Sequence, residues 1–137
     1  MSLSIPKEIM DEMINHSKEE LPNESCGYLA GKDGEVHKLI RMHNTDQEPD
    51  HFTFEPKEQF AAVKAARQDG LSLLSVYHSH PSSPARPSAE DLRLLKDPNM
   101  IYVIVSLETE AGDVKAYRIV DGNVSNIEIN ESGRVLS

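Results

Sequence analysis

Residues 71–77 read Leu-Ser-Leu-Leu-Ser-Val-Tyr, and this nearly continuous apolar run is the feature that most limits the fold. A strand that faces water on one side alternates apolar and polar residues, whereas a run of this kind predicts a strand buried on both faces. Such a strand lies in the centre of a sheet. Because His78 and His80 follow directly, the sequence predicts that both imidazoles lie at the end of a core strand.

Three segments have the apolar spacing of helices that would cover this sheet. Residues 5–16 carry apolar side chains at helical intervals behind Ser4, a suitable cap. Residues 56–68 predict a second helix, which Gly70 would end. A short third helix is predicted over residues 88–95. Helices therefore alternate with strands along the chain.

Further strands are predicted from short apolar and β-branched runs between turn signals. They cover residues 26–30, 35–42, 52–54, 100–107, 113–120 and 124–129. Two loops have hairpin chemistry, residues 31–34 and the pair Asp121-Gly122. The order of the elements predicts an α/β fold, an α+β sandwich with a mixed central sheet flanked by helices. The length of 137 residues suits a single domain over residues 1–137.

Composition excludes several classes of partner. The formal net charge of −9 argues against nucleic acid, because binding to phosphates depends on clustered Lys and Arg. No apolar run approaches the roughly 20 residues that cross a bilayer, and the N-terminus lacks the pattern of a secretory signal. Cys26 is the single cysteine, so no internal disulfide can form. We therefore expect a cytoplasmic protein whose partner is a protein, a peptide or a small molecule.

His78, His80 and Asp91 have the spacing of a metal site. Side chains two apart on a strand point the same way, about 6 to 7 Å apart, so both imidazoles can reach one ion. Asp91 is the third residue of the helix after Ser88, and the proline-rich loop 81–87 limits how far that helix can move. Three protein ligands with one open position are typical of catalytic zinc.

Each of these features also has an ordinary explanation. Ser88-x-x-Asp91 is a helix capping box, and a His-x-His pair is more often a surface or core feature than a metal ligand. The two features together, behind a buried strand, favour a metal site. The capping role and the metal-site role need not exclude each other.

The segment His78-Ser-His80-Pro81, with Asp91 ten residues further along and a Pro-Ser step before it, resembles the signature of the JAMM or MPN-plus zinc metalloproteases. The resemblance covers nearly the whole chain. It implies the cytidine-deaminase-like JAMM/MPN fold, and it implies that His78, His80 and Asp91 bind Zn²⁺.

The resemblance also assigns roles to two residues outside the metal triad. It implies that Glu24, which stands just before the first predicted strand, serves as the acid/base catalyst. It implies that the Ser88 hydroxyl donates to the oxyanion of a tetrahedral intermediate. A carboxylate beside a zinc-activated water can take a proton from that water and deliver it to a leaving amine.

In the family, the bond that is cut commonly follows the C-terminal Gly-Gly of ubiquitin or a ubiquitin-like protein. Only residues 96–99 separate the predicted third helix from the next strand, so the long insertion with which larger relatives read ubiquitin chains is not expected here. The chain is thus similar to compact prokaryotic members, some of which process ubiquitin-like sulfur-carrier proteins. The expected substrate is the C-terminus of such a carrier, or a peptide.

Three other function classes compete with this one. A non-catalytic MPN-type protein-binding module remains an alternative, as does a metallopeptidase that acts on phage or cell-wall peptides. A zinc nucleoside deaminase is excluded, because its motif needs at least two cysteines and this chain has one.

Other polar residues are weaker candidates. No cysteine-enzyme signature surrounds Cys26, so a nucleophilic role is not favoured. Asn44 follows a strand end and could orient a substrate or a ligand. Ser79 is expected to point away from the two histidines and to form a local hydrogen bond. The unpaired histidines are expected on the surface: His16, His37 and His51.

Overall fold

Seven strands form the sheet of the computed structural model, which describes residues 2–46 and 52–132. They are β1 (Ser2–Pro6), β2 (Cys26–Lys32), β3 (Glu35–Met42), β4 (Ser72–His80), β5 (Ile101–Ser106), β6 (Asp113–Val120) and β7 (Asn123–Ser132). Their order is β1-β3-β2-β4-β5-β6-β7, and β1 also pairs with β7, so the sheet closes on itself. Parallel and antiparallel pairs both occur, which confirms the predicted mixed sheet.

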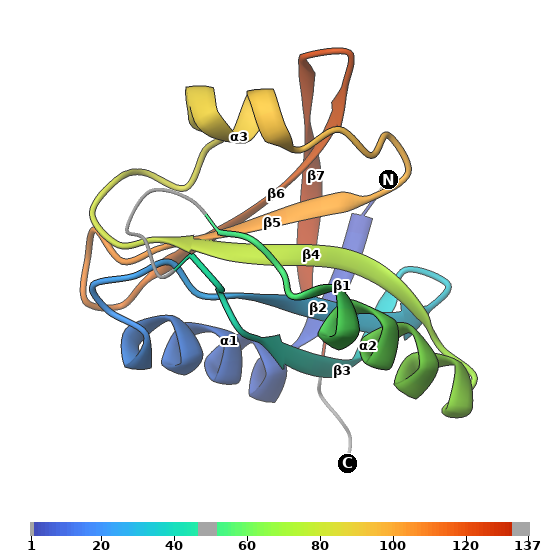
Figure 1. The fold of residues 1–137 in the computed structure, drawn as a ribbon. Coiled ribbons are helices and arrows are strands. Elements are labelled where there is room, and N and C mark those ends of the chain that lie inside the picture. Colours follow the sequence, from blue (N-terminus) through green and yellow to red (C-terminus); the bar gives the residue numbers. More distant parts are fainter. Residues whose placement is uncertain (1, 47–51, 133–137) are drawn as a thin grey trace.

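Three helices accompany these strands in the described part of the chain: α1 (Lys7–Glu19), α2 (Pro56–Gln68) and α3 (Ala89–Leu94). In Figure 1, α1 and α2 lie near β2 and β3, whereas α3 lies beyond β5. Among the residues that can be described, none of these helices has the length and apolar character needed to cross a bilayer.

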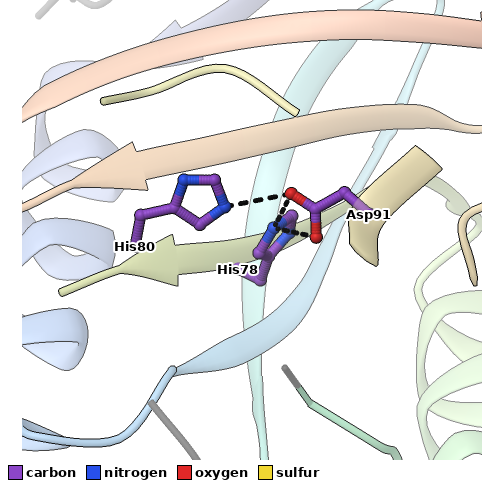
Figure 2. Close-up of side chains that lie close together, drawn as sticks. All are labelled: His78, His80 and Asp91. Carbon is purple, nitrogen blue, oxygen red and sulfur yellow. Dashed lines mark hydrogen bonds and ion pairs between the residues drawn. The ribbon is translucent and has the colours of Figure 1, made fainter. Parts of the chain in front are cut away.

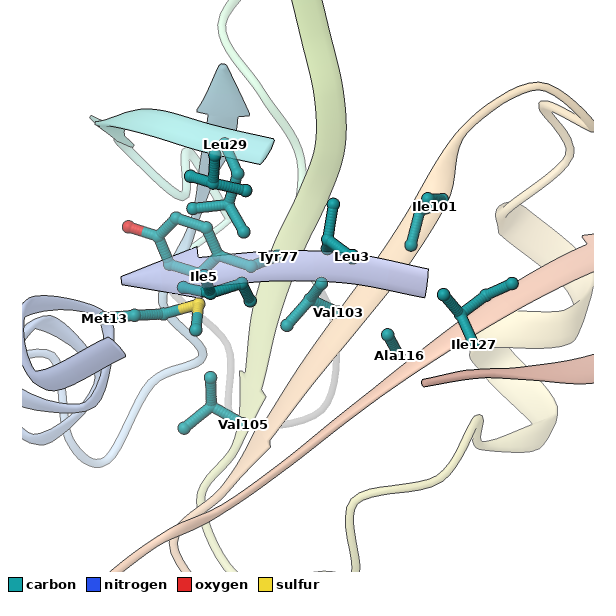
Figure 3. Close-up of a cluster of buried hydrophobic side chains, with 11 residues drawn as sticks. Leu3, Ile5, Met13, Leu29, Tyr77, Ile101, Val103, Val105, Ala116 and Ile127 are labelled. Carbon is teal, nitrogen blue, oxygen red and sulfur yellow. The ribbon is translucent and has the colours of Figure 1, made fainter. Parts of the chain in front are cut away.

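The central strands bury side chains on both faces. One cluster, drawn in Figure 3, holds Tyr77 of β4 together with Met13 of α1. A second cluster holds Val76 of β4 together with Ala62 of α2. Since side chains alternate along a strand, α1 and α2 cover opposite faces of β4. His78 and His80 therefore share the α2 face, and Ser79 lies on the α1 face.

Strand β4 is central, as predicted from its apolar run. It pairs with β2 on one side and with β5 on the other, and its residues 75–80 are buried. The strand continues through both histidines. Its parallel pairing with β5 extends as far as His80, which lies opposite Ser106. Backbone hydrogen bonds therefore fix the two imidazoles to the sheet.

The N-terminal segment differs from the prediction. Residues 2–6 form β1, and the helix begins only at Lys7, so Ile5 belongs to a strand. Leu3 and Ile5 are buried while their neighbours are more exposed, which is the alternation of a strand. The helical spacing of Ile5 with later residues misled the prediction, because a pairing with β7 far along the chain decides its conformation.

The predicted strand over residues 52–54 is wrong. Phe52 and Phe54 lie in irregular backbone, and their rings contact each other. Phe54 also lies against Tyr28 of β2, with ring centroids 5.0 Å apart. The aromatic residues pack as side chains on the sheet and add no strand to it. Part of the predicted loop over residues 44–50, and His51, lie outside the described residues.

Both predicted hairpin turns are confirmed. Asp33 and Gly34 have φ values of 54° and 77°, and Asp121 and Gly122 have values of 51° and 79°. Two consecutive residues with positive φ are the requirement of a tight two-residue hairpin.

Candidate metal centre

The ligand atoms of His78, His80 and Asp91 converge on one point. They all lie within 4.8 Å of one another, and the three side chains are buried. The Nε2 atoms of His78 and His80 lie 3.2 Å and 3.0 Å from Oδ2 of Asp91. Figure 2 shows both imidazoles pointing at the carboxylate from β4, while Asp91 approaches from α3. These side chains form a group that could hold a metal ion.

The start of α3 aims Asp91 at this point. The backbone N–H of Ser88 donates to Oδ2 of Asp91 at 3.0 Å, and the backbone N–H of Asp91 donates to Oγ of Ser88 at 3.0 Å. This reciprocal pair is the capping box that the sequence predicted. The same carboxylate oxygen that caps the helix also faces the imidazoles, so the two readings of this motif are compatible.

A backbone carbonyl sets the tautomer of His80. Its Nδ1 lies 2.8 Å from the carbonyl oxygen of Pro84, so this nitrogen carries the hydrogen. In the neutral ring Nε2 then has a lone pair, and it faces a carboxylate oxygen. The lone pair of Nε2 and the oxygen Oδ2 of Asp91 are both hydrogen-bond acceptors. At 3.0 Å they repel each other unless a proton or a cation lies between them. Metal-binding histidines commonly donate their other ring N–H to a carbonyl, so the arrangement fits a metal ligand.

His78 is enclosed on the other side of the carboxylate. Its side chain is fully buried, and its ring stacks on Phe52 with centroids 4.9 Å apart. Its Nδ1 has no hydrogen-bond partner among the residues that the structure describes. The ring is therefore held by packing, with Nε2 directed at Asp91.

The protonation of the group reflects this geometry. Burial alone would raise the pKa of Asp91, but contact with the imidazoles of His78 and His80, which donate to it when protonated, holds this pKa well below its ordinary value. Burial disfavours a charged His80, yet its bonds with Asp91 and the Pro84 carbonyl raise its pKa. The carboxylate stays ionised and attracts positive charge, as a divalent cation would supply.

A pocket of about 590 Å³ opens beside these residues. Its lining includes Glu24, His80 and Ser88, which come from the turn before β2, from β4 and from the start of α3. Glu24 is 2% exposed. The fold therefore brings the predicted catalytic residues Glu24 and Ser88 to one pocket with a predicted metal ligand.

A second pocket, of about 290 Å³, is also lined by residues of α3, and the sequence did not predict it. Asp91 lines it together with apolar side chains that include Phe52, Leu94 and Met100. Glu90 lines both pockets, so α3 contributes to the walls of each. The spacing Phe52-x-Phe54 is the signal for this pocket in the sequence, but the same spacing also predicts a strand.

The remaining polar candidates are buried or form hydrogen bonds within the fold. Burial raises the pKa of the Cys26 thiol, which keeps it protonated and agrees with the weak case for a nucleophile. The Nδ2 of Asn44 donates to the carbonyl of Glu24 at 3.2 Å. The prediction for His16 is wrong: its side chain is 3% exposed, and its Nδ1 lies 2.7 Å from the Tyr77 hydroxyl.

Comparison with known proteins gives a consistent result. The sequence profile of prokaryotic homologs of the JAB domain matches residues 6–120. The CysO-cysteine peptidase of Mycobacterium tuberculosis (strain ATCC 25618 / H37Rv) is 31% identical over 131 residues, which are 93% of this chain and 90% of that protein. The desampylase of Pyrococcus furiosus is 34% identical over 107 residues, which are 77% and 74% of the two chains.

A solved structure has the same fold. The solution structure of protein DSY2949 from Desulfitobacterium hafniense superposes with a TM-score of 0.90 at 40% sequence identity. The superposition covers 97% of this chain and 94% of that one. The arrangement of strands and helices described above is thus shared along almost the whole length.

Proposed function

Because this chain belongs to the family of prokaryotic JAB-domain proteins, we propose that it is a zinc-dependent hydrolase of protein conjugates. The bond that it cuts is the peptide or isopeptide bond after the C-terminal Gly-Gly of a ubiquitin-like protein, with a sulfur-carrier protein as the favoured substrate. Family membership confirms the resemblance to JAMM/MPN-plus proteins and the expected fold. The names of two similar proteins, a peptidase and a desampylase, support a hydrolase.

The proposal depends on one observation above all. The ligand atoms of His78, His80 and Asp91 converge, and Glu24 and Ser88 line the pocket beside them. Two imidazoles and a carboxylate suit zinc, which takes nitrogen and oxygen ligands and keeps a position open in catalytic sites. When bound, zinc lowers the pKa of water to about 7 and polarises a carbonyl oxygen.

The protein residues have separate tasks in this mechanism. The Pro84 carbonyl keeps Nδ1 of His80 protonated, which leaves Nε2 as the ligand atom. The carboxylate of Glu24 takes the proton from the attacking water and then delivers it to the nitrogen of the leaving amine. Its place in the pocket wall supports this role, since a buried carboxylate there meets few bulk waters that could exchange the proton.

Ser88 is proposed to stabilise the developing negative charge. Its oxygen accepts the backbone N–H of Asp91, so its own O–H remains to donate to the carbonyl oxygen of the scissile bond. A fixed donor at such a position lowers the barrier because the charge develops in the transition state. The capping bond also keeps Ser88 from turning away.

The smaller pocket, which apolar side chains and residues of α3 line, is proposed to receive the tail of the carrier. Its walls include Phe52, Leu94 and Met100, and it reaches Asp91. An extended tail could then place a large apolar side chain in this pocket and its small Gly-Gly end at the metal centre. The pocket also has polar groups, among them Gln59, Glu90 and Asp97, and apolar walls combined with polar groups that fix orientation are the common form of a binding site.

The test is cleavage of a carrier protein that has residues appended to its Gly-Gly end. We expect the purified protein to release the appended residues, to lose this activity with a chelator, and to recover it when zinc is added back. Cleavage that persists without metal contradicts the proposal. A protein that binds the carrier tightly and never cleaves it would instead be a non-catalytic binding module, and cleavage restricted to phage or cell-wall peptides would select the remaining alternative.

A further inference from the structure

The peptide bond between Glu24 and Ser25 is held at both ends by side chains from other elements. Its carbonyl oxygen accepts a hydrogen bond from Nδ2 of Asn44 at 3.2 Å. Its N–H donates to Oγ of Ser79 at 2.8 Å. The next carbonyl, that of Ser25, accepts the backbone N–H of Ser79 at 3.1 Å. This set of bonds fixes the plane of the peptide, and with it the direction in which the Glu24 side chain leaves the backbone.

Ser79 stands between two of the predicted metal ligands but serves the other face of the strand. Its side chain is fully buried and forms a hydrogen bond, as predicted, but the partner is the backbone of Ser25 in the turn before β2 and not a local group. Ser25 also has a side-chain partner in α1, because Oγ of Ser17 lies 2.9 Å from Oγ of Ser25. The turn that carries Glu24 is thus joined to the same strand that carries His78 and His80.

Asn44 holds the turn from a second direction. It follows β3 and is 7% exposed. Its Oδ1 accepts the backbone N–H groups of Asp46 and Thr53, each at 3.1 Å, while Nδ2 reaches Glu24. One amide therefore links the loop beside the apolar pocket to the turn before β2.

We propose that Ser79 and Asn44 are positioning residues, which hold the carboxylate of Glu24 at a fixed place relative to the metal ligands. The inference rests on the proposed acid/base role of Glu24 and adds the residues through which the fold enforces it. Small displacements of a catalytic group can lower rates by orders of magnitude, whereas the affinity for substrate does not depend on Glu24 being aligned. Neither Ser79 nor Asn44 needs to touch the substrate.

The experiment is a double-mutant cycle between Ser79→Ala and Glu24→Gln, read as single-turnover rates on the carrier substrate. We expect Ser79→Ala to lower kcat about 10-fold with KM and zinc content unchanged. In the Glu24→Gln background, the same change is expected to alter the rate by less than about 2-fold, because a residue that acts through Glu24 has nothing left to position. A purely structural effect would persist in full in both backgrounds.

Ser75→Ala is the matched control. Ser75 is a buried serine on the same strand, and its Oγ has no hydrogen-bond partner within residues 2–46 and 52–132. This variant removes a buried hydroxyl without touching the turn, and its kcat should equal that of the wild type. A readout independent of activity is amide exchange: the Ser25 N–H should exchange faster in Ser79→Ala than in Ser75→Ala.

Asn44→Asp provides a second route if Ser79→Ala does not fold. It keeps an oxygen for Asp46 and Thr53, and it replaces the donor to the Glu24 carbonyl by a negatively charged oxygen. We expect Asn44→Asp to lower kcat as Ser79→Ala does. We expect no such loss when Asn44→Asp is combined with Glu24→Gln. The inference is overturned if the kcat effect persists when Glu24 is replaced, or if both variants keep full kcat. If Glu24→Gln itself keeps wild-type turnover, the proposed acid/base role of Glu24 fails instead, and amide exchange still reports whether the turn is held. A wild-type protein that does not cleave the carrier would contradict the proposed function.

Discussion

The Nε2 atom of His80 lies 3.0 Å from the Oδ2 atom of Asp91, and the backbone of Ser88 donates to the same oxygen. One carboxylate oxygen thus joins the end of a central strand to the first turn of a helix. Because that oxygen faces a lone pair on the neutral imidazole, the contact is favourable only with a cation or a proton between the two atoms. The metal-binding predictions follow from this contact.

Asp91→Ala is expected to abolish stoichiometric metal binding. The change removes one of the three converging ligands, and it also removes the side-chain half of the capping box, at a cost of about 1 kcal/mol in the free energy of unfolding. Elemental analysis after dialysis measures the metal content. Ser88→Ala is the control, since it removes the other half of the cap and keeps the ligands. If Asp91→Ala retained one zinc per chain, the site would lie elsewhere.

Glu24→Gln is expected to retain zinc and to lose at least about 100-fold in turnover. The amide has nearly the same shape as the carboxylate but cannot take the proton from water, and general acid/base catalysis contributes on this scale. Single-turnover cleavage of the carrier fusion gives the rate, and elemental analysis gives the zinc content. Unchanged turnover in a zinc-loaded variant would remove Glu24 from the mechanism.

Leu94→Ala is expected to raise KM about 10-fold with little effect on kcat. Leu94 lines the apolar pocket and is 50% exposed, so its truncation should cost little stability while removing contact with the carrier tail. Initial rates over a range of carrier concentrations separate KM from kcat. Val124→Ala, a change of an exposed residue in β7, should leave both constants unchanged. Equal KM values for the two variants would place the tail outside this pocket.

His16 should make the stability of the metal-free protein depend on pH. Burial lowers the pKa of His16 to about 4, well below the ordinary value near 6.5. The unfolded chain therefore binds the proton first, and the stabilisation from neutral His16 is complete above pH 6.5 and is lost as the pH falls towards 4. Urea unfolding at pH 7 and pH 4.5 should show a smaller decrease for His16→Gln than for the wild type. The exposed His37→Gln variant should show the wild-type decrease.

Local sequence patterns predicted most of the elements around the site. The apolar run before His78 identified the central strand, and the paired Asp-Gly turns identified both hairpins. The spacing of His78, His80 and Asp91 predicted their convergence, because strand alternation and a capped helix determine direction over a short length of chain. These features depend on neighbours within about one turn or one strand.

The missed features depend on distant parts of the chain. Strand β1 exists because β7 pairs with it, and nothing near Ile5 indicates that partner. The polar side chain of His16 is buried because Tyr77, far along the chain, supplies a hydrogen-bond partner. The apolar pocket likewise forms where Phe52, Leu94 and Met100 meet from separate segments. Tertiary contacts of this kind override local propensity.

Helix α3 has six residues, too few to be stable in water without outside support. Two backbone bonds at the ends of the helix, from Leu92 to the Ser88 carbonyl and from Leu95 to the Asp91 carbonyl, are accepted by the two residues of the capping box. When the carboxylate of Asp91 is no longer held, the free energy of local opening of this helix should fall far below that of global unfolding. Since residues of α3 line both pockets, a metal-free protein would keep its sheet intact while the two pockets lose their shape.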